Sequence, residues 1–181
     1  MRVIGIDPGN AVTGFGIVER RADLQHIAAG TIRGGQRRGP ERLATLYRKL
    51  VEVIDLHEPK VMSLERSFAA LNVRSALTLG EARAVAMLAA AHRGLELFEY
   101  NPTDVKLSIA GYGRADKEQV KDMVRRTLGL APDSDLSNDA SDALAIALCH
   151  VFRERMPRPL AVRRSWPRSA VGVDAVARTR P

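Results

Sequence analysis

Four acidic residues at three separated places in the chain have the types and spacing to do chemistry together. Asp7 follows the apolar run at residues 3–6, and Glu65 ends a second run of the same kind at residues 61–64. Asp139 and Asp142 are three residues apart at the start of a helical pattern, so they share one helix face. Converging carboxylates repel one another unless a hard cation lies between them, and oxygen ligands suit Mg²⁺ or Mn²⁺. Together the four acids predict a divalent-metal site.

Each acid also has a purely structural explanation when it is taken alone. Asp7 could form a turn, because Pro8 and a glycine follow it. Glu65 could pair with Arg66 or Arg74, and the two later acids could interact with the dipole of their own helix. The metal site is favoured only by the joint arrangement, in which a strand–helix–strand return brings the ends of the first and fourth strands side by side.

The elements that must position these acids follow from hydrophobic periodicity and turn residues. Strands are predicted at residues 2–7, 13–19 and 24–32, joined by short turns that favour an antiparallel meander, and at 61–65 and 95–100. Helices are predicted over about residues 40–56, 74–93, 103–110, 117–128 and 138–155. Asp116 and Gln119 resemble a capping box, and Ser137 or Asn138 caps the last helix. The expected fold class is α/β, a mixed five-stranded sheet with helices on both faces.

Composition predicts one globular domain with a basic extension. The chain has 181 residues, of which 45% are hydrophobic and 27% charged, which suits a single globular domain over residues 1–156. Residues 157–181 are rich in proline and arginine and are expected to form a disordered tail. No run of about 20 apolar residues predicts a membrane span, and no signal segment is recognised at the N-terminus. The single cysteine, Cys149, cannot form an internal disulfide, which fits a cytoplasmic location.

The net charge of +7 is concentrated at the C-terminus. Residues 153–181 hold eight arginines against two acidic residues, whereas residues 1–152 hold 20 basic and 19 acidic side chains. A nucleic-acid surface on the body of the protein must therefore arise from local clustering of basic side chains and not from bulk charge.

Four segments of the chain resemble one known family. They are IGIDPGNAVTGFGIV, LERSFAALNVRSALTLGEARAV, EYNPTDVKLSIAGYGRADKEQV and NDASDALAIALCH. These motifs resemble those of the RuvC family of Holliday-junction endodeoxyribonucleases, in family order and spacing, over residues 1–152. The family's four catalytic, metal-binding acids match Asp7, Glu65, Asp139 and Asp142.

The resemblance implies an RNase H-like fold, a homodimer, and Mg²⁺-dependent nicking of four-way DNA junctions in recombination and repair. Two Mg²⁺ ions per subunit are expected, with Mn²⁺ as the alternative. The expected products are symmetric nicks with 5′-phosphate and 3′-hydroxyl ends. The family also implies RuvA and RuvB, the branch-migration proteins, as partners. The helix at residues 74–93, rich in alanine and glycine, is the expected dimer interface, with ordinary core packing as the alternative.

Expected DNA contacts are basic or aromatic side chains in the motifs. Lys106 and Lys117 match basic positions that the family uses near the scissile phosphate, and Phe68 could stack on an unpaired base at the crossover. Further candidate phosphate partners are Arg74, Arg114 and Lys121. An arm of the junction could also lie against Arg33, Arg37, Arg38 and Arg42.

Three other functions remain open at this point. An actin-like ATPase opens with a similar strand and turn, but this chain lacks a second lobe and a Walker-type loop. A non-catalytic junction-binding module would have no reason to gather carboxylates at its DNA face. A nuclease acting on RNA–DNA hybrids would share the fold, and competition between a four-way junction and a linear hybrid would separate it from a resolvase.

Overall fold

A computed structural model of the protein describes residues 1–34, 39–66, 73–131 and 134–154. Phe68, Arg37, Arg38 and the expected tail at residues 157–181 lie outside the described residues. Among the described helices, none is both long enough and apolar enough to cross a membrane.

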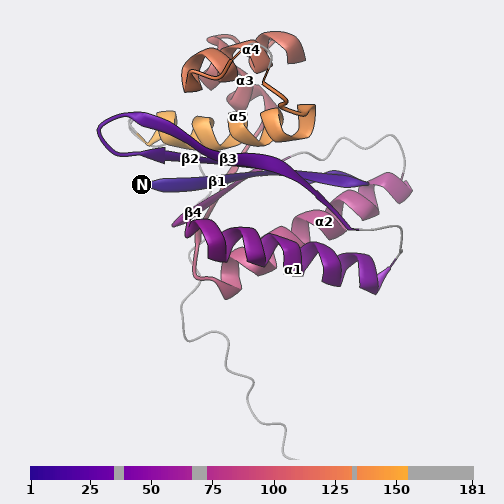
Figure 1. Ribbon diagram of the computed structural model, residues 1–181. Coiled ribbons are helices and arrows are strands. Elements are labelled where there is room, and N and C mark those ends of the chain that lie inside the picture. The colour runs from indigo at the N-terminus through magenta and orange to yellow at the C-terminus, as the bar shows by residue number, and fades with distance from the viewer. Residues whose placement is uncertain (35–38, 67–72, 132–133, 155–181) are drawn as a thin grey trace, which may run out of the picture.

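A five-stranded mixed sheet forms the centre of the molecule (Figure 1). Its strand order is β3-β2-β1-β4-β5. The strands are β1 Arg2–Asp7, β2 Val12–Arg20, β3 Leu24–Arg33, β4 Val61–Glu65 and β5 Glu96–Tyr100. The first three form an antiparallel meander, whereas β4 pairs parallel to both β1 and β5. The predicted meander and mixed sheet are confirmed.

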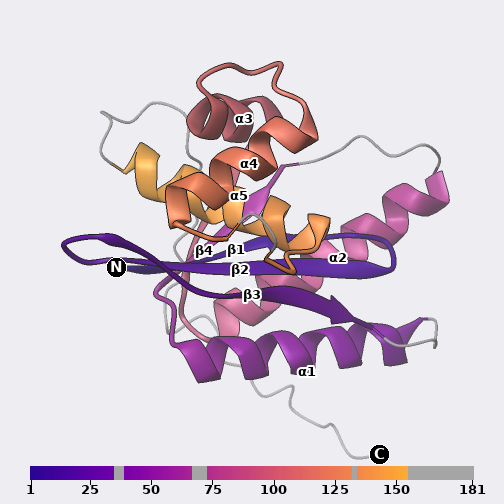
Figure 2. The same cartoon turned by 45° about the horizontal axis from the view of Figure 1, so that its top comes forward.

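Helices cover both faces of this sheet, as predicted. They are α1 Pro40–His57, α2 Val73–His92, α3 Pro102–Ala110, α4 Lys117–Leu128 and α5 Asn138–Arg153. Figures 1 and 2 show α1 and α2 on one face and α5 on the other, with α3 and α4 stacked beyond α5. Successive residues of β1 point to opposite faces of the sheet. Ile4 packs in the core between the sheet and α1 and α2, and Val3 packs in the core between the sheet and α5.

Glycines allow α5 to lie unusually close to the sheet. A Cβ atom on Gly5 would overlap the carbonyl oxygen of Ala143, and one on Gly16 would lie 2.6 Å from the backbone nitrogen of Leu144. No larger side chain fits at these two positions without moving the helix. The backbone of α5 therefore rests directly on β1 and β2, which fixes the position of the acids near its start.

Helix starts agree with the predicted caps. Asp116 and Gln119 form a capping box at the start of α4, in which each side chain accepts a hydrogen bond from the other residue's backbone N–H. The cap of α5 is Ser137, whose hydroxyl accepts from the backbone N–H of Ala140 at 3.3 Å. Cys149 is fully buried, as expected for a small core residue.

Candidate active site

Two of the four acids lie at neighbouring strand ends. Asp7 is the last residue of β1 and Glu65 the last residue of β4. The strands run parallel in a register that pairs Ile6 with Leu64, so the next residues, Asp7 and Glu65, end their strands side by side at the same edge of the sheet. The sequence-based expectation that these two carboxylates are brought together is confirmed.

The start of α5 brings the other two acids to the same edge, Asp139 from its first turn and Asp142 from the next. Gly14 of β2 pairs with Asp7 across the β1–β2 ladder. A Cβ atom on Gly14 would overlap the carbonyl oxygen of Asp139, so the start of α5 sits on β2 directly beside the end of β1. Asp142 follows one turn later and faces the same cleft as Asp7 and Glu65.

A cleft of about 270 Å³ lies over these strand ends. Its walls include Asp7, Glu65 and Asp142 together with Lys106 from α3 and Lys117 from α4. Apolar side chains of α3, α4 and α5 complete the lining, namely Pro102, Val105, Val120 and Ala145. The cleft thus combines carboxylates that can hold a cation with ammonium groups that can hold an anion.

Burial and mutual repulsion perturb the carboxylates. Burial, followed by the charges of Asp142, Glu65 and Asp139, raises the pKa of Asp7 from 3.8 to about 7, and Lys117 opposes this shift. The pKa of Glu65 is also raised, first by burial and then by Asp142. Both shifts mean that it is unfavourable for the carboxyl groups in this cleft to be ionised together without a compensating cation.

Lys117 provides part of that compensation. Its Nζ donates to Oδ2 of Asp142 at 3.1 Å, and this hydrogen bond raises the pKa of Lys117. The lysine side chain is 74% exposed, so it can leave Asp142 without disturbing the core. An exposed pair of this kind is weak, and a divalent cation could replace the ammonium group.

The donor chemistry of the cleft fits a hard divalent cation, since all of its acidic donors are carboxylate oxygens. As the side chains stand, no three Asp, Glu, His or Cys residues within the described ranges are grouped closely enough to coordinate one ion. Coordination of one ion by three of these acids would need their carboxylates to turn toward one point.

Residues 3–150 match the family model described as crossover junction endodeoxyribonuclease RuvC. The chain belongs to the RuvC family. A RuvC from Chloroflexus aggregans is 48% identical over 157 residues, covering 84% of this chain and 93% of the relative. A RuvC from Pelotomaculum thermopropionicum is 44% identical over 165 residues, covering 90% of this chain and all of the relative. The family consists of divalent-metal-dependent nucleases.

The fold also agrees with solved RuvC structures. RuvC of Thermus thermophilus in complex with a Holliday junction substrate superposes with a TM-score of 0.80 at 33% identity, over 86% of this chain and 96% of that chain. The RNase H-like α/β class is therefore confirmed. So is the enzyme class, an endodeoxyribonuclease that acts on crossover junctions in recombination and repair.

A buried ion-pair network supports the end of β4 in this RuvC protein. Glu99 of β5 is 3% exposed and pairs with Arg83 of α2 and, at 3.8 Å, with Arg66. Arg83 also donates from Nη1 to the backbone carbonyl of Glu65 at 2.7 Å. Within the described residues, the ion pair that Arg66 forms is with Glu99 and not with Glu65.

Sequence reasoning missed this network. Its one local signal is a charged residue, Glu99, inside the buried strand LFEY, because a charge in such a strand must have a partner. A second missed link is Ser63 of β4, whose hydroxyl donates to the carbonyl of Ile146 in α5 at 3.2 Å. Both interactions connect the strand that carries Glu65 to the helices around it.

The predicted DNA contacts are divided between two places. Lys106 and Lys117 line the cleft with the acids, and Lys121 donates to the side chain of Asn138, next to Asp139, at 2.7 Å. Arg114 is exposed shortly before α4. Arg74 does not line this cleft but lies in a second one.

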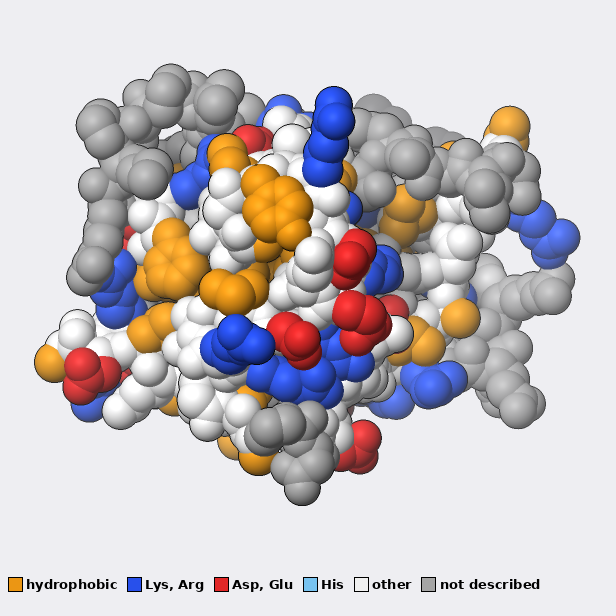
Figure 3. Space-filling model, turned by 90° about the horizontal axis from the view of Figure 1, so that it is seen from above, with side chains coloured by type: hydrophobic (Ala, Val, Ile, Leu, Met, Phe, Trp, Pro, Cys, Tyr) orange, Lys and Arg blue, Asp and Glu red, His pale blue; other side chains and the backbone are white. Residues whose placement is uncertain are grey.

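The surface over α3 and α4 is not uniformly positive (Figure 3). Figure 3 shows acidic groups beside lysine and arginine groups on that face. This mixture agrees with the near-neutral body expected from the sequence, and it means that individually placed cations must make the phosphate contacts.

Proposed function

We propose that this RuvC protein nicks four-way DNA junctions in the cleft between β1, β4 and α5, with Asp7, Glu65, Asp139 and Asp142 as its catalytic acids. The observation that carries the proposal is the meeting of two parallel strand ends, each bearing a carboxylate, with the acid-bearing first turn of α5. The perturbed pKa values of Asp7 and Glu65 support it, because groups that must act together at a site are commonly perturbed there.

The carboxylates would hold two Mg²⁺ ions per subunit, and Mn²⁺ is the alternative because oxygen donors alone do not separate the two. Bound divalent metal supplies an activated water and charge stabilisation for phosphodiester hydrolysis. Asp7, at the end of the central strand β1, would help to hold the metal, and it must lose its proton to do so. The products would be symmetric nicks with 5′-phosphate and 3′-hydroxyl ends.

Basic side chains around the cleft would hold the substrate. Lys106 and Lys117 would neutralise phosphate oxygens next to the carboxylates, which would otherwise repel DNA. Arg114 and Lys121, on the α4 side, would extend this contact along the strand. Phe68 would stack on an unpaired base at the crossover.

Paired cuts require two sites related by symmetry, and a C₂ homodimer provides them. Helix α2 supports this arrangement because Val73, Leu77 and Leu88 are exposed by 77%, 65% and 49% and project from one side of the helix. RuvA and RuvB would deliver the junction, and the reaction would take place in the cytoplasm. Residues 1–156 would form the nuclease domain, and residues 157–181 would add a basic tail.

Cleavage of a labelled synthetic four-way junction tests the proposal directly. The protein is incubated with Mg²⁺ or Mn²⁺ and the junction or a linear duplex, beside Asp7→Asn and the matched control Asp122→Asn on exposed α4. Paired nicks on the junction alone, absent in Asp7→Asn and retained in Asp122→Asn, are expected. Cleavage by Asp7→Asn at the wild-type rate would refute the assignment of the site.

A further inference from the structure

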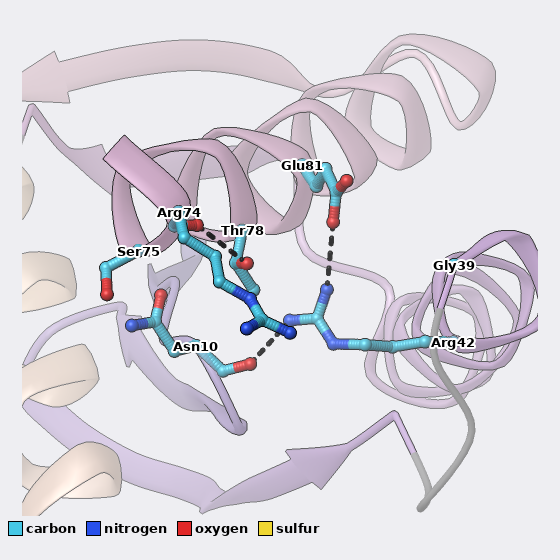
Figure 4. Close-up of a pocket in the computed structure, with 7 residues that line it drawn as sticks. All are labelled: Asn10, Gly39, Arg42, Arg74, Ser75, Thr78 and Glu81. Atoms are coloured by element: carbon cyan, nitrogen blue, oxygen red, sulfur yellow. Dashed lines mark hydrogen bonds and ion pairs between the residues drawn. The ribbon is translucent and has the colours of Figure 1, made fainter. Parts of the chain in front are cut away.

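A second cleft, of about 420 Å³, lies between α1 and α2 on the sheet face opposite α5 (Figure 4). The residues that matter here come from three segments. Arg42 belongs to the first turn of α1, Arg74 and Ser75 to the first turn of α2, and Asn10 to the turn between β1 and β2. Among the described residues that line the cleft, only Glu81 has a carboxylate.

Arg42 is held in place and largely shielded from water. Its Nη2 donates to the backbone carbonyl of Asn10 at 2.8 Å, and its Nη1 pairs with Glu81 at 3.4 Å. The Arg42 side chain is 12% exposed, whereas that of Glu81 is 48% exposed. The guanidinium is therefore preorganised, and its contacts with described residues use two of its five N–H donors.

Arg74 adds a second positive charge to the same cleft. Figure 4 shows its side chain entering from the α2 wall, while that of Arg42 enters from the α1 wall. Within the described part of the chain, no carboxylate forms an ion pair with Arg74. Two guanidinium groups in one cleft repel each other, and one glutamate cannot neutralise both. An anion with several acceptor oxygens would relieve this repulsion, and guanidinium geometry matches phosphate.

The turn that carries Asn10 connects this cleft to the acid cleft. Asn10 is three residues after Asp7, so their Cα atoms are at most about 11 Å apart. Successive phosphates of one DNA strand advance about 3.4 Å along the axis of a duplex. A strand that passes over the turn would therefore carry a phosphate from one cleft to the other within a few nucleotides.

We propose that the cleft between Arg42 and Arg74 is a second phosphate site, which binds the cleaved DNA strand a few nucleotides from the phosphodiester at Asp7. This inference rests on the proposed function, because it takes its ligand from the DNA that the acid cleft would cut. It goes beyond that function by placing part of the DNA path on the α1 and α2 face of the sheet.

Two kinds of change test the proposal together. One alters the charge of an arginine side chain, and the other replaces a charged DNA phosphate by an uncharged methylphosphonate. Junction binding is measured by fluorescence anisotropy across a salt series, with Ca²⁺ in place of Mg²⁺ so that binding is read without cleavage. The variants are Arg74→Gln, Arg74→Lys and the matched control Arg48→Gln, a 68% exposed arginine of α1. In parallel, single methylphosphonates replace the phosphates on both sides of the cut, one position at a time.

Arg74→Gln should weaken junction binding several-fold and lower the slope of log K against log salt by about one. Arg74→Lys should keep the slope, and Arg48→Gln should match the wild type. One methylphosphonate, a few nucleotides from the cut, should weaken wild-type binding and have no further effect in Arg74→Gln, since both changes remove the same contact.

The proposal is overturned if Arg74→Gln binds like Arg48→Gln, or if every methylphosphonate effect adds to that of Arg74→Gln. Failure of the proposed function is a separate result, in which the wild type binds the junction but does not cut it with Mg²⁺ or Mn²⁺. The binding measurements decide the second phosphate site in either case, because they do not depend on cleavage.

Discussion

Asp7→Asn should stabilise the metal-free protein above pH 7, even though it should abolish cleavage. The pKa of Asp7 is raised from 3.8 to about 7 in the folded state, first by burial and then by the neighbouring acids. Between these pH values the folded state binds one more proton than the unfolded state, so stability falls as pH rises. The loss begins near pH 4 and is complete just above pH 7.

The size of this effect follows from the same shift. Each pKa unit corresponds to about 1.4 kcal/mol, so ionised Asp7 lowers the free energy of unfolding by about 4 kcal/mol at pH 8. Asparagine carries no charge and avoids this loss. The stability difference between Asp7→Asn and the wild type should therefore grow between about pH 4 and pH 7 and level off at up to about 4 kcal/mol.

Urea unfolding followed by circular dichroism measures this difference, with EDTA present, at several values between pH 5 and pH 8. Asp122→Asn, in which an exposed carboxylate is removed, should show little change at any pH. Added Mn²⁺ should stabilise the wild type more than Asp7→Asn, because ligands stabilise the state that binds them. A difference that is absent at pH 8, or that does not vary with pH, would refute the raised pKa that burial and the neighbouring acids give Asp7.

Three further changes test other parts of the site. Lys117→Met should tighten Mn²⁺ binding by the free protein, measured by calorimetry, because it frees Asp142 from its ion pair. Junction cleavage by this variant should fall. Unchanged Mn²⁺ affinity would argue that the lysine does not compete with metal. Gly14→Ala should lower stability by about 1–3 kcal/mol in urea unfolding and also reduce cleavage by the folded protein, since its methyl group displaces the start of α5. Glu99→Gln should lower stability by about 1–3 kcal/mol, because it removes the charge that pairs with the partly exposed Arg83 and Arg66. A loss no greater than that of Glu96→Gln, an exposed control on the same strand, would contradict this.

The parts of the site that sequence reasoning predicted depend on local patterns. Asp7 and Glu65 each follow a short apolar run, and a buried strand that stops on a charge places that charge at a sheet edge. The spacing of Asp139 and Asp142 follows from the helical period. The capping box at Asp116 is likewise contained in four consecutive residues.

The parts that escaped prediction depend on contacts between distant segments. A glycine in a strand reads as a turn or bulge signal, and only the docked α5 shows that Gly5 and Gly16 provide room for a helix backbone. Glu99 meets Arg83 of α2 and Arg66 just after β4, which precede it by 16 and 33 residues in the chain. Arg74 was expected beside the acids, but α2 begins on the other face of the sheet, where its first turn faces Arg42.

The close seating of α5 on the sheet has a consequence for protein synthesis. This helix is the last described element, and it completes both the core over β1 and β2 and the set of four acids. A nascent chain that lacks it has the two strand-end carboxylates, an uncovered apolar sheet face and no helix acids. Since the chain emerges from the ribosome N-terminus first, the capacity to cut DNA should arise only when folding is finished, and truncated chains should be degraded without nicking the chromosome.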